Sequence, residues 1–422
     1  MVGGAEQRRW PLWLALACVA CLLLCATPLV VGAIAYNEVA AGPPTAVPSP
    51  RAGEQPAATV AWLRTRIDEV LAAQAVALLR GDEAGYLRRV DGAATAVARR
   101  EYANLRALGI GRWEPGVFDG PTRRADGTWR ATVRVEHCFG AADCPTLPIR
   151  FATSWADRPG GVELVDLETS AAVDGGPRPW ESDALITAAG SRVLVSASAD
   201  LGGSLPSVVA EADAAAAVAD RYAIGGTPAR YVVFYAGGTQ WKRWYGGGRP
   251  PWTGGYATPA GFPRLGVVVN AAAPGRTLLD DLLRHELTHA ASMAGNPEHG
   301  DDVWWLIEGL AELAANGGTP VARYEGLPEV ANAVRRTGWN GPLSAVHVAR
   351  DASQAEVSAA YGVGFLAVRH LAERFGERDL LAFYAAVVVD REPVDKASRR
   401  AFGTPWATLQ DECVAAVRAA AT

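Results

Sequence analysis

Two histidines four residues apart around a glutamate are the strongest chemical signal in the sequence. The chain has only six histidines among 422 residues, and His285 and His289 enclose Glu286 in the run LLDDLLRHELTHAASMA, residues 278–294. On a helix, side chains four residues apart emerge on one face, so both imidazoles can ligate one zinc ion. Glu286 then lies where it can act as general base toward a water molecule. On this motif alone, two histidines that only pack within a helix remain an alternative.

The next helical pattern supplies two more carboxylates. DDVWWLIEGLAELAANGG, residues 301–318, reads as an amphipathic helix on which Glu308 and Glu312 lie four residues apart. Catalytic zinc normally takes three protein ligands, and Glu308 would be the third. Glu312 would accept a hydrogen bond from a ligand imidazole and so fix its tautomer and orientation. The sequence thus predicts a zinc site of His285, His289 and Glu308 with Glu312 behind it.

The eighteen residues between HELTH and the glutamate of WLIEGLAEL give a spacing that resembles the aminopeptidase branch of the gluzincin metallopeptidases. Thermolysin-like enzymes have a near-identical arrangement. The segment YGVGFLAVRHL, residues 361–371, resembles the Tyr-x-x-Gly-Phe helix start of this branch, whose tyrosine stabilises the oxyanion. The resemblance implies a zinc metallopeptidase (peptidase MA-like) that cleaves peptide or protein substrates. It also implies that Glu286 is the catalytic base and that Tyr361 assists it.

One family feature is missing. Aminopeptidases of the branch carry a Gly-x-Met-Glu-Asn segment whose glutamate holds the substrate's free amine. The corresponding region here, GFPRLGVVVNAAAPG, has no acidic residue, so specificity for chain ends is not supported. The chain looks more like compact bacterial membrane-linked peptidase-like domains that share only the zinc helices.

The segment from 176 to 422 has the pattern of an α+β catalytic domain, which we expect to be thermolysin-like with a small sheet and a mainly helical C-terminal half. Strands are predicted at 191–198, 229–237 and 263–270, and a helix at 206–222. We expect the strand PRLGVVVN to form the sheet edge along which an extended peptide pairs. The stretch at 237–263, rich in glycine and tryptophan, would overhang the cleft as a lip, or would be a plain connector.

Residues 57–175 are predicted to form a smaller α+β domain, with two helical stretches followed by strands at 128–138, 147–157 and 161–169. This order resembles the nuclear transport factor 2-like (NTF2-like) fold. Cys138 and Cys144 enclose a short turn, FGAAD, and in an oxidising compartment this pair would form a local disulfide.

The N-terminal region is predicted to export the chain. Arg8 and Arg9 precede a stretch without charge from Trp10 to Asn37, which is long enough to cross a bilayer. We therefore expect a cytoplasmic segment at 1–9, a transmembrane anchor at 10–36 and a linker rich in proline and alanine at 37–56. The expected localisation is a single-pass protein of the cell membrane with an extracytoplasmic catalytic domain; a cleaved signal peptide, which would leave a secreted chain, is the alternative.

Composition limits the remaining function classes. Half of the residues are hydrophobic, 20% are charged and the formal net charge is −5, which argues against disorder and against nucleic-acid binding. A different class of function stays open, namely an inactive peptidase-like or NTF2-like binding or sensing module at the cell surface.

Overall fold

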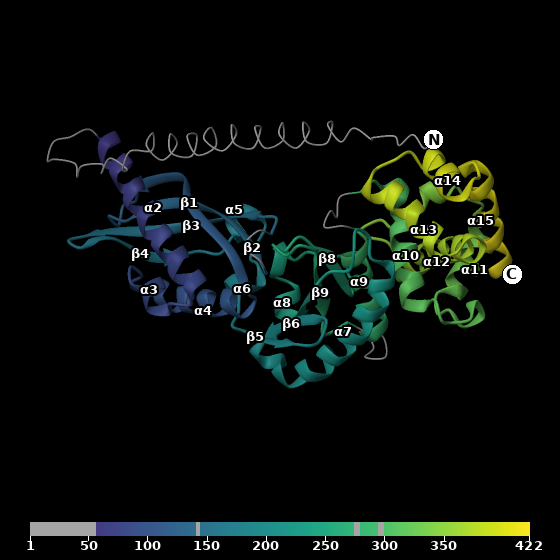
Figure 1. Cartoon of the computed structure of the whole chain (residues 1–422), viewed down its shortest axis with the longest axis horizontal. Helices are drawn as coiled ribbons and strands as arrows, with labels where there is room; N and C mark the ends of the chain where they lie inside the picture. The colour runs from purple at the N-terminus through teal and green to yellow at the C-terminus, as the bar shows by residue number, and fades with distance from the viewer. Residues whose placement is uncertain (1–55, 141–143, 274–278, 294–298) are drawn as a thin grey trace, which may run out of the picture. The chain divides into compact units, whose positions relative to one another are not determined.

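The computed structural model describes residues 56–140, 144–273, 279–293 and 299–422, and it shows a mixed α+β chain with small sheets and a helical C-terminal half (Figure 1). The chain divides into two units, Met1–Thr65 and Arg66–Thr422. The first unit contributes only the first turns of helix α2 (Pro56–Arg80) to the described residues. The second unit holds both sheets and all later helices.

No helix among the described residues is both long and apolar enough to cross a membrane. The longest of them, α2, has 25 residues but carries Arg64, Arg66, Asp68 and Glu69 within two turns, and burying such charges in hydrocarbon is costly. The localisation predicted above, a single-pass cell-membrane protein with an extracytoplasmic catalytic domain, is therefore wrong by this finding. The anchor proposed at 10–36 lies outside the described residues.

The first sheet is an antiparallel meander in which each strand pairs with the next along the chain, in the order β1-β2-β3-β4. Its strands and the helices α3 and α4 before it have these bounds: α3 (Glu83–Leu87), α4 (Ala94–Ala107), β1 (Ile110–Arg123), β2 (Trp129–Phe139), β3 (Leu147–Arg158) and β4 (Gly161–Leu167). Sequence patterns did not reveal β1, which contains Pro115. Proline is tolerated there because β1 is an edge strand and needs hydrogen bonds on one side only.

The second sheet is mixed, with the order β5-β6-β7-β9-β8. Its elements are β5 (Leu185–Ala189), β6 (Val193–Ser198), α7 (Leu205–Ala219), β7 (Tyr231–Ala236), β8 (Gly255–Thr258) and β9 (Gly266–Asn270). The parallel strands β6, β7 and β9 are rich in valine and buried, as expected for central strands covered on both faces. The strand predicted as the sheet edge, PRLGVVVN, is instead β9 and lies between β7 and β8. The edge strands are β5 and β8, and β8 comes from the segment that was expected to be a lip or connector.

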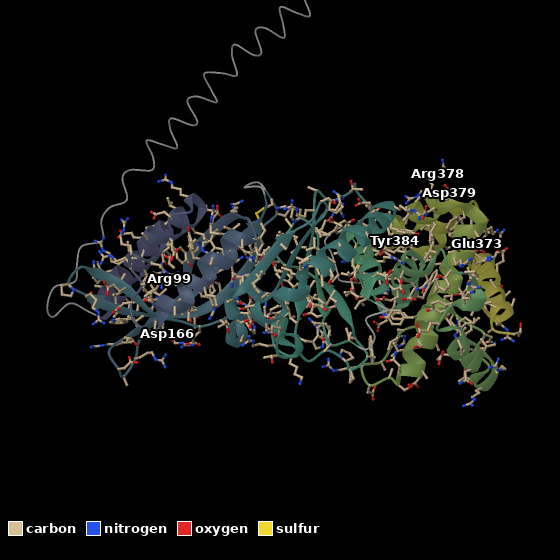
Figure 2. The ribbon with its side chains drawn as sticks, turned by 90° about the horizontal axis from the view of Figure 1, so that it is seen from below. Arg99, Asp166, Glu373, Arg378, Asp379 and Tyr384 are labelled. Atoms are coloured by element: carbon tan, nitrogen blue, oxygen red, sulfur yellow. A yellow bond between two sulfur atoms is a disulfide. The ribbon has the colours of Figure 1, made fainter. Side chains whose placement is uncertain are left out.

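The helical half contains α9 (Leu279–Ser292), α10 (Trp304–Asn316), α11 (Leu327–Thr337), α12 (Gln354–Phe375), α13 (Glu377–Tyr384), α14 (Val394–Phe402) and α15 (Trp406–Ala420). One hydrophobic core extends from the second sheet into these helices. Helix α13 has an exposed and a buried side: in Figure 2, Arg378 projects outward, whereas Tyr384 lies among the helices. The Tyr384 hydroxyl is 3.1 Å from the Ser292 hydroxyl, which ties α13 to the C-terminal end of α9.

The two sheets are joined at the end of β2. The backbone N–H of Phe139 donates a hydrogen bond of 2.7 Å to the carbonyl of Gly261, and the Phe139 ring stacks on Phe262 with centroids 4.5 Å apart. Cys138, the residue before Phe139, forms a disulfide with Cys144. The strand that carries this disulfide therefore supports the chain between β8 and β9.

Candidate metal and catalytic site

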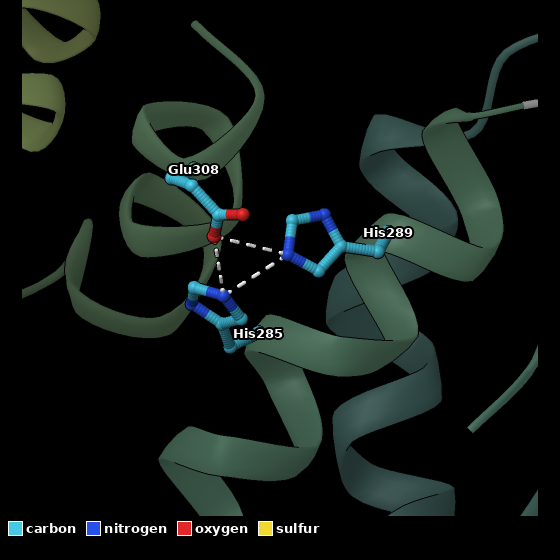
Figure 3. Close-up of side chains that lie close together, drawn as sticks. All are labelled: His285, His289 and Glu308. Atoms are coloured by element: carbon cyan, nitrogen blue, oxygen red, sulfur yellow. Dashed lines mark hydrogen bonds and ion pairs between the residues drawn. The ribbon is translucent and has the colours of Figure 1, made fainter. Parts of the chain in front are cut away.

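Helices α9 and α10 bring three potential metal ligands together (Figure 3). The Nε2 atoms of His285 and His289 are 3.0 Å apart, and Oε2 of Glu308 lies 3.0 Å from the first and 3.2 Å from the second. Each of the three residues offers one ligand atom to this triangle. Both histidines are buried, with 8% and 7% of their surface exposed. The three atoms lie at the corners of a nearly equilateral triangle.

This triangle fits zinc by size and by chemistry. In a tetrahedral site with metal–ligand bonds of about 2.0–2.1 Å, ligand atoms lie about 3.3 Å apart, close to the separations seen here. Two imidazoles and one carboxylate also form the donor set of catalytic zinc sites that leave a fourth position open. His285, His289 and Glu308 are therefore the residues that would hold the metal.

Glu312 holds the first histidine from behind. Its Oε1 lies 3.1 Å from Nδ1 of His285, so a proton on Nδ1 leaves Nε2 free to face the other two ligands. The second oxygen of Glu312 accepts hydrogen bonds from the Tyr324 hydroxyl at 3.0 Å and from the Asn316 side-chain amide at 3.2 Å. Both oxygens of the Glu312 carboxylate are thus held by hydrogen bonds, and the carboxylate in turn fixes the orientation of the His285 ring.

The electrostatics of this cluster favour a cation. Burial alone lowers the pKa of His285, but hydrogen bonds to Glu308 and Glu312 outweigh it and hold the pKa well above its usual value. Burial raises the pKa of the Glu308 carboxyl, but the attraction of His289 and the hydrogen bonds of both imidazoles outweigh it and hold the pKa far below normal. Carboxylates that remain ionised although buried need positive charge beside them. Because ligands bind metals in deprotonated form, a divalent cation would replace the proton of His285.

Glu286 follows His285 on α9 and lies close enough to the cluster for His285, His289 and Glu308 to act on its carboxyl. It is only 5% exposed, and its Oε2 is buried with no hydrogen-bond partner in the part of the chain that the structure describes. Burial raises the pKa of this carboxyl. The backbone of β8 passes directly beside it, because a Cβ added at Gly255 would lie 2.8 Å from Oε1 of Glu286. The open edge strand and the candidate base therefore meet at a glycine, where the backbone can approach closely.

A contact between glycines brings Tyr361 to the site. A Cβ added at Gly309 on α10 would lie 2.4 Å from the carbonyl oxygen of Gly364 on α12, so the two helices cross backbone to backbone. Gly309 follows Glu308, and Gly364 belongs to the same YGVGF segment as Tyr361. At this crossing the Tyr361 ring lies 5.7 Å from the His285 ring and 5.0 Å from the Trp304 ring, between centroids. Burial, reinforced by Glu308 and Glu286, raises the pKa of its phenol well above normal.

The structure thus brings together all six residues that the sequence singled out for the site, which are His285, Glu286, His289, Glu308, Glu312 and Tyr361. Tyr361 lies in the second turn of α12 and not at its start, because a capping box of Ser353 and Glu356 begins the helix earlier. Two hydrogen-bond partners of Glu312 were not predicted from the sequence. Asn316, four residues after Glu312, could have been found as a helical neighbour, whereas Tyr324 follows the helix in a segment without a recognisable pattern.

Comparison with known proteins gives a distant structural likeness only. No protein-family model and no curated protein matches the chain. Among solved structures, the chain is similar to the M1 zinc metallopeptidase of Deinococcus radiodurans, with a TM-score of 0.35 and 18% identity over 64% of this chain and 60% of that one. It is similar to native yeast LTA4 hydrolase with a TM-score of 0.36 and 12% identity, over 61% and 41%. The chain spans less than two thirds of either structure, and at these scores no function is transferred from them.

Proposed function

We propose that the chain is a zinc-dependent peptidase of gluzincin type with a thermolysin-like catalytic domain. The observation that carries the proposal is the triangle of His285, His289 and Glu308, with the unpartnered carboxylate oxygen of Glu286 and the edge of β8 beside it. A structural zinc site would have no need for a buried free carboxylate or for an open strand next to it. The boundary that we propose between the NTF2-like and catalytic domains, near residue 175, lies between the last strand of the first sheet and the first strand of the second.

The chain's own groups divide the work of hydrolysis. Zinc, when bound, supplies a Lewis acid for the peptide carbonyl and lowers the pKa of water. Glu286 takes the proton of the attacking water and delivers it to the leaving amine. The Tyr361 phenol, which burial keeps protonated, donates a hydrogen bond to the developing oxyanion. Glu312 keeps the His285 ring in place, and the β8 edge pairs with the extended substrate backbone.

The test is to purify the full chain, measure its zinc content and follow cleavage of a mixed peptide library by mass spectrometry. Glu286→Gln should retain zinc, because Glu286 is not a ligand, and should lose cleavage by at least about 100-fold, the lower range for general-base catalysis. Glu325→Gln is the matched control, because Glu325 is an exposed carboxylate next to Tyr324 and outside the site.

Each outcome has a defined meaning. Zinc in both variants, with cleavage by wild type and Glu325→Gln only, supports the peptidase. Zinc without cleavage in any protein would replace the proposal with the binding-module alternative. A chain that binds no zinc would overturn it entirely.

A further inference from the structure

A cavity of about 520 Å³ lies between the first sheet and the segment that contains β8. Its walls include Arg134 on β2 and Arg150 on β3, together with Arg178 and Tyr245 from the chain that follows the first sheet. Thr258, the last residue of β8, also lines it. The cavity is therefore built jointly by the first sheet and by the end of the strand that passes Glu286.

Its charge is predominantly positive. Three arginines line the cavity against one carboxylate, Asp174. Asp174 is engaged by Arg150, at 2.9 Å from its guanidinium, and Arg134 forms an ion pair with Glu136 on its own strand. Arg178 forms no ion pair within the described residues; its guanidinium donates to the backbone carbonyl of Asp174 at 3.3 Å and lies 5.2 Å from the centre of the Tyr245 ring. At least one guanidinium thus keeps donors available for an anion.

Tyr245, in the wall of this cavity, has an unusual backbone conformation and an unusual hydroxyl environment. Its backbone has a φ of 52° and a ψ of 39°, a left-handed conformation that residues other than glycine rarely adopt. A hydrogen bond of 2.9 Å from its backbone N–H to the carbonyl of Pro177 secures it next to Arg178. Its hydroxyl is buried and has no hydrogen-bond partner in the described part of the chain. Strained residues and unsatisfied polar groups concentrate at binding sites, so two independent features point to this wall.

The cavity is in reach of the reaction centre. Gly255 lies against Glu286, and Thr258 three residues later lines the cavity. A strand rises about 3.3 Å per residue, so the cavity begins about 10 Å along β8 from the candidate base. An extended peptide paired with β8 rises at the same rate and would present a residue three or four positions from the scissile bond to the arginines.

We propose that this cavity binds a carboxylate of the substrate, three or four residues from the bond that is cleaved. The carboxylate is either an acidic side chain or the C-terminal carboxylate of a short peptide. Arg178 is its main partner, and Arg134, which also pairs with Glu136, is the second. Arginine suits this role because its planar group donates two parallel hydrogen bonds to a carboxylate. The inference rests on the proposed peptidase function for its geometry, but the binding it describes is measurable without catalysis.

The experiment uses the full chain and fluorescently labelled peptides whose affinity is measured by anisotropy. One peptide is neutral with an amidated C-terminus, others carry a single aspartate moved one position at a time, and one keeps a free C-terminus. We expect one aspartate register, or the free C-terminus, to bind about tenfold more tightly than the neutral amide, the gain of about one charge-assisted hydrogen bond. The two arms distinguish the side chain from the chain end.

Arginine variants then locate the effect. Arg178→Gln should abolish the preference and Arg134→Gln should weaken it, and in both variants the affinity for acidic peptides should fall more than the affinity for the neutral peptide. Arg158→Gln is the matched control, because Arg158 is exposed on the same strand as Arg150 and does not line the cavity. Arg134 is exposed, so its variant remains informative if Arg178→Gln fails to fold.

The results separate this inference from the proposed function. Binding of acidic peptides that depends on the arginines, without cleavage, would support the cavity as a carboxylate site and contradict the proposed peptidase function. Cleavage without any acidic preference, or equal loss of neutral and acidic binding in the variants, would overturn the cavity as a carboxylate site.

Discussion

Two buried histidines in this chain show what distinguishes a candidate metal ligand from a packing residue. His285 on α9 is 8% exposed and His137 on β2 is completely buried, so burial alone does not separate them. His285 contacts two carboxylates, which raise its pKa, whereas His137 packs against the rings of Trp113, Phe139 and Trp180. Burial there lowers the pKa of His137 to about 4.

The difference teaches that the surroundings decide which charge state a buried imidazole adopts. Burial among uncharged rings removes the water that would solvate a charged His137 and supplies no carboxylate in its place, so the neutral ring is favoured. A pair of carboxylates favours a positive charge at the same depth, which a proton or a metal ion can supply. The following experiments separate the two environments.

Removal of one ligand charge should have the largest effect. Glu308→Gln keeps the shape of the side chain but removes the carboxylate from the triangle. We expect zinc affinity, measured by competition with a chelator, to fall by more than about 100-fold, because even partners behind the ligands change affinity by about 10–100-fold. Unchanged affinity would show that Glu308 is not a ligand. Glu325→Gln again serves as the control.

The aromatic surroundings of His137 should make the protein sensitive to acid. Because the folded state favours neutral His137, the unfolded chain takes up the proton first as the pH falls below about 6.5, and stability declines until about pH 4. The shift corresponds to about 3 kcal/mol of unfolding free energy by pH 4. In His137→Gln this part of the pH dependence should disappear from denaturant titrations, while the exposed His347→Gln should retain it. Parallel pH profiles for all three proteins would refute the assignment.

The crossing at Gly309 and Gly364 packs α10, which carries Glu308 and Glu312, directly against α12. Gly309→Ala places a methyl group 2.4 Å from the Gly364 carbonyl, which forces the helices apart. We expect a loss of about 2 kcal/mol in unfolding free energy, within the range for overpacked cores, together with reduced zinc affinity. Gly318→Ala, where a Cβ meets nothing within 4 Å, should leave both quantities nearly unchanged. A neutral Gly309→Ala would mean that the crossing is adaptable.

The smallest effect should come from the outer hydrogen bond. Tyr324→Phe removes the donor to Glu312 but keeps the ring against Phe365, whose centroid is 4.5 Å away. We expect a loss of about 1 kcal/mol in stability and less than about tenfold in zinc affinity. If Tyr324→Phe weakened zinc binding as strongly as Glu308→Gln does, the distinction drawn here between ligands and their supports would fail.

The residues of the candidate site could be predicted from the sequence wherever they lie close together along the chain. His285 and His289 lie four residues apart on one helix, and Glu308 and Glu312 four residues apart on the next, so helical geometry places each pair on one face, with Glu286 next to the first pair. Tyr361 lies far along the chain and was located by resemblance alone. What joins α10 to α12 is the contact of Gly309 with Gly364, which has no periodic pattern.

Strand order was the part that sequence could not provide. The pattern of PRLGVVVN identifies a buried strand, but its partners depend on chain segments far away, and β8 is only four residues long. Its sequence, GYAT, has no alternation that distinguishes it from a loop. The sequence predicts His137 as an ordinary packing or surface residue, and the structure shows that it packs in the core. Its neighbours Trp113 and Trp180 come from distant segments and could not be predicted.

The junction at Phe139 has a consequence for dividing this protein into fragments. Phe139 covers Phe262 and packs with Trp180, both of which lie on the C-terminal side of the boundary near residue 175. A fragment that begins there would expose these rings to water, where contiguous aromatic surface promotes aggregation. The part of the chain after residue 175 is therefore unsuited to expression as a free-standing module, because the first sheet supplies Phe139, which covers these rings.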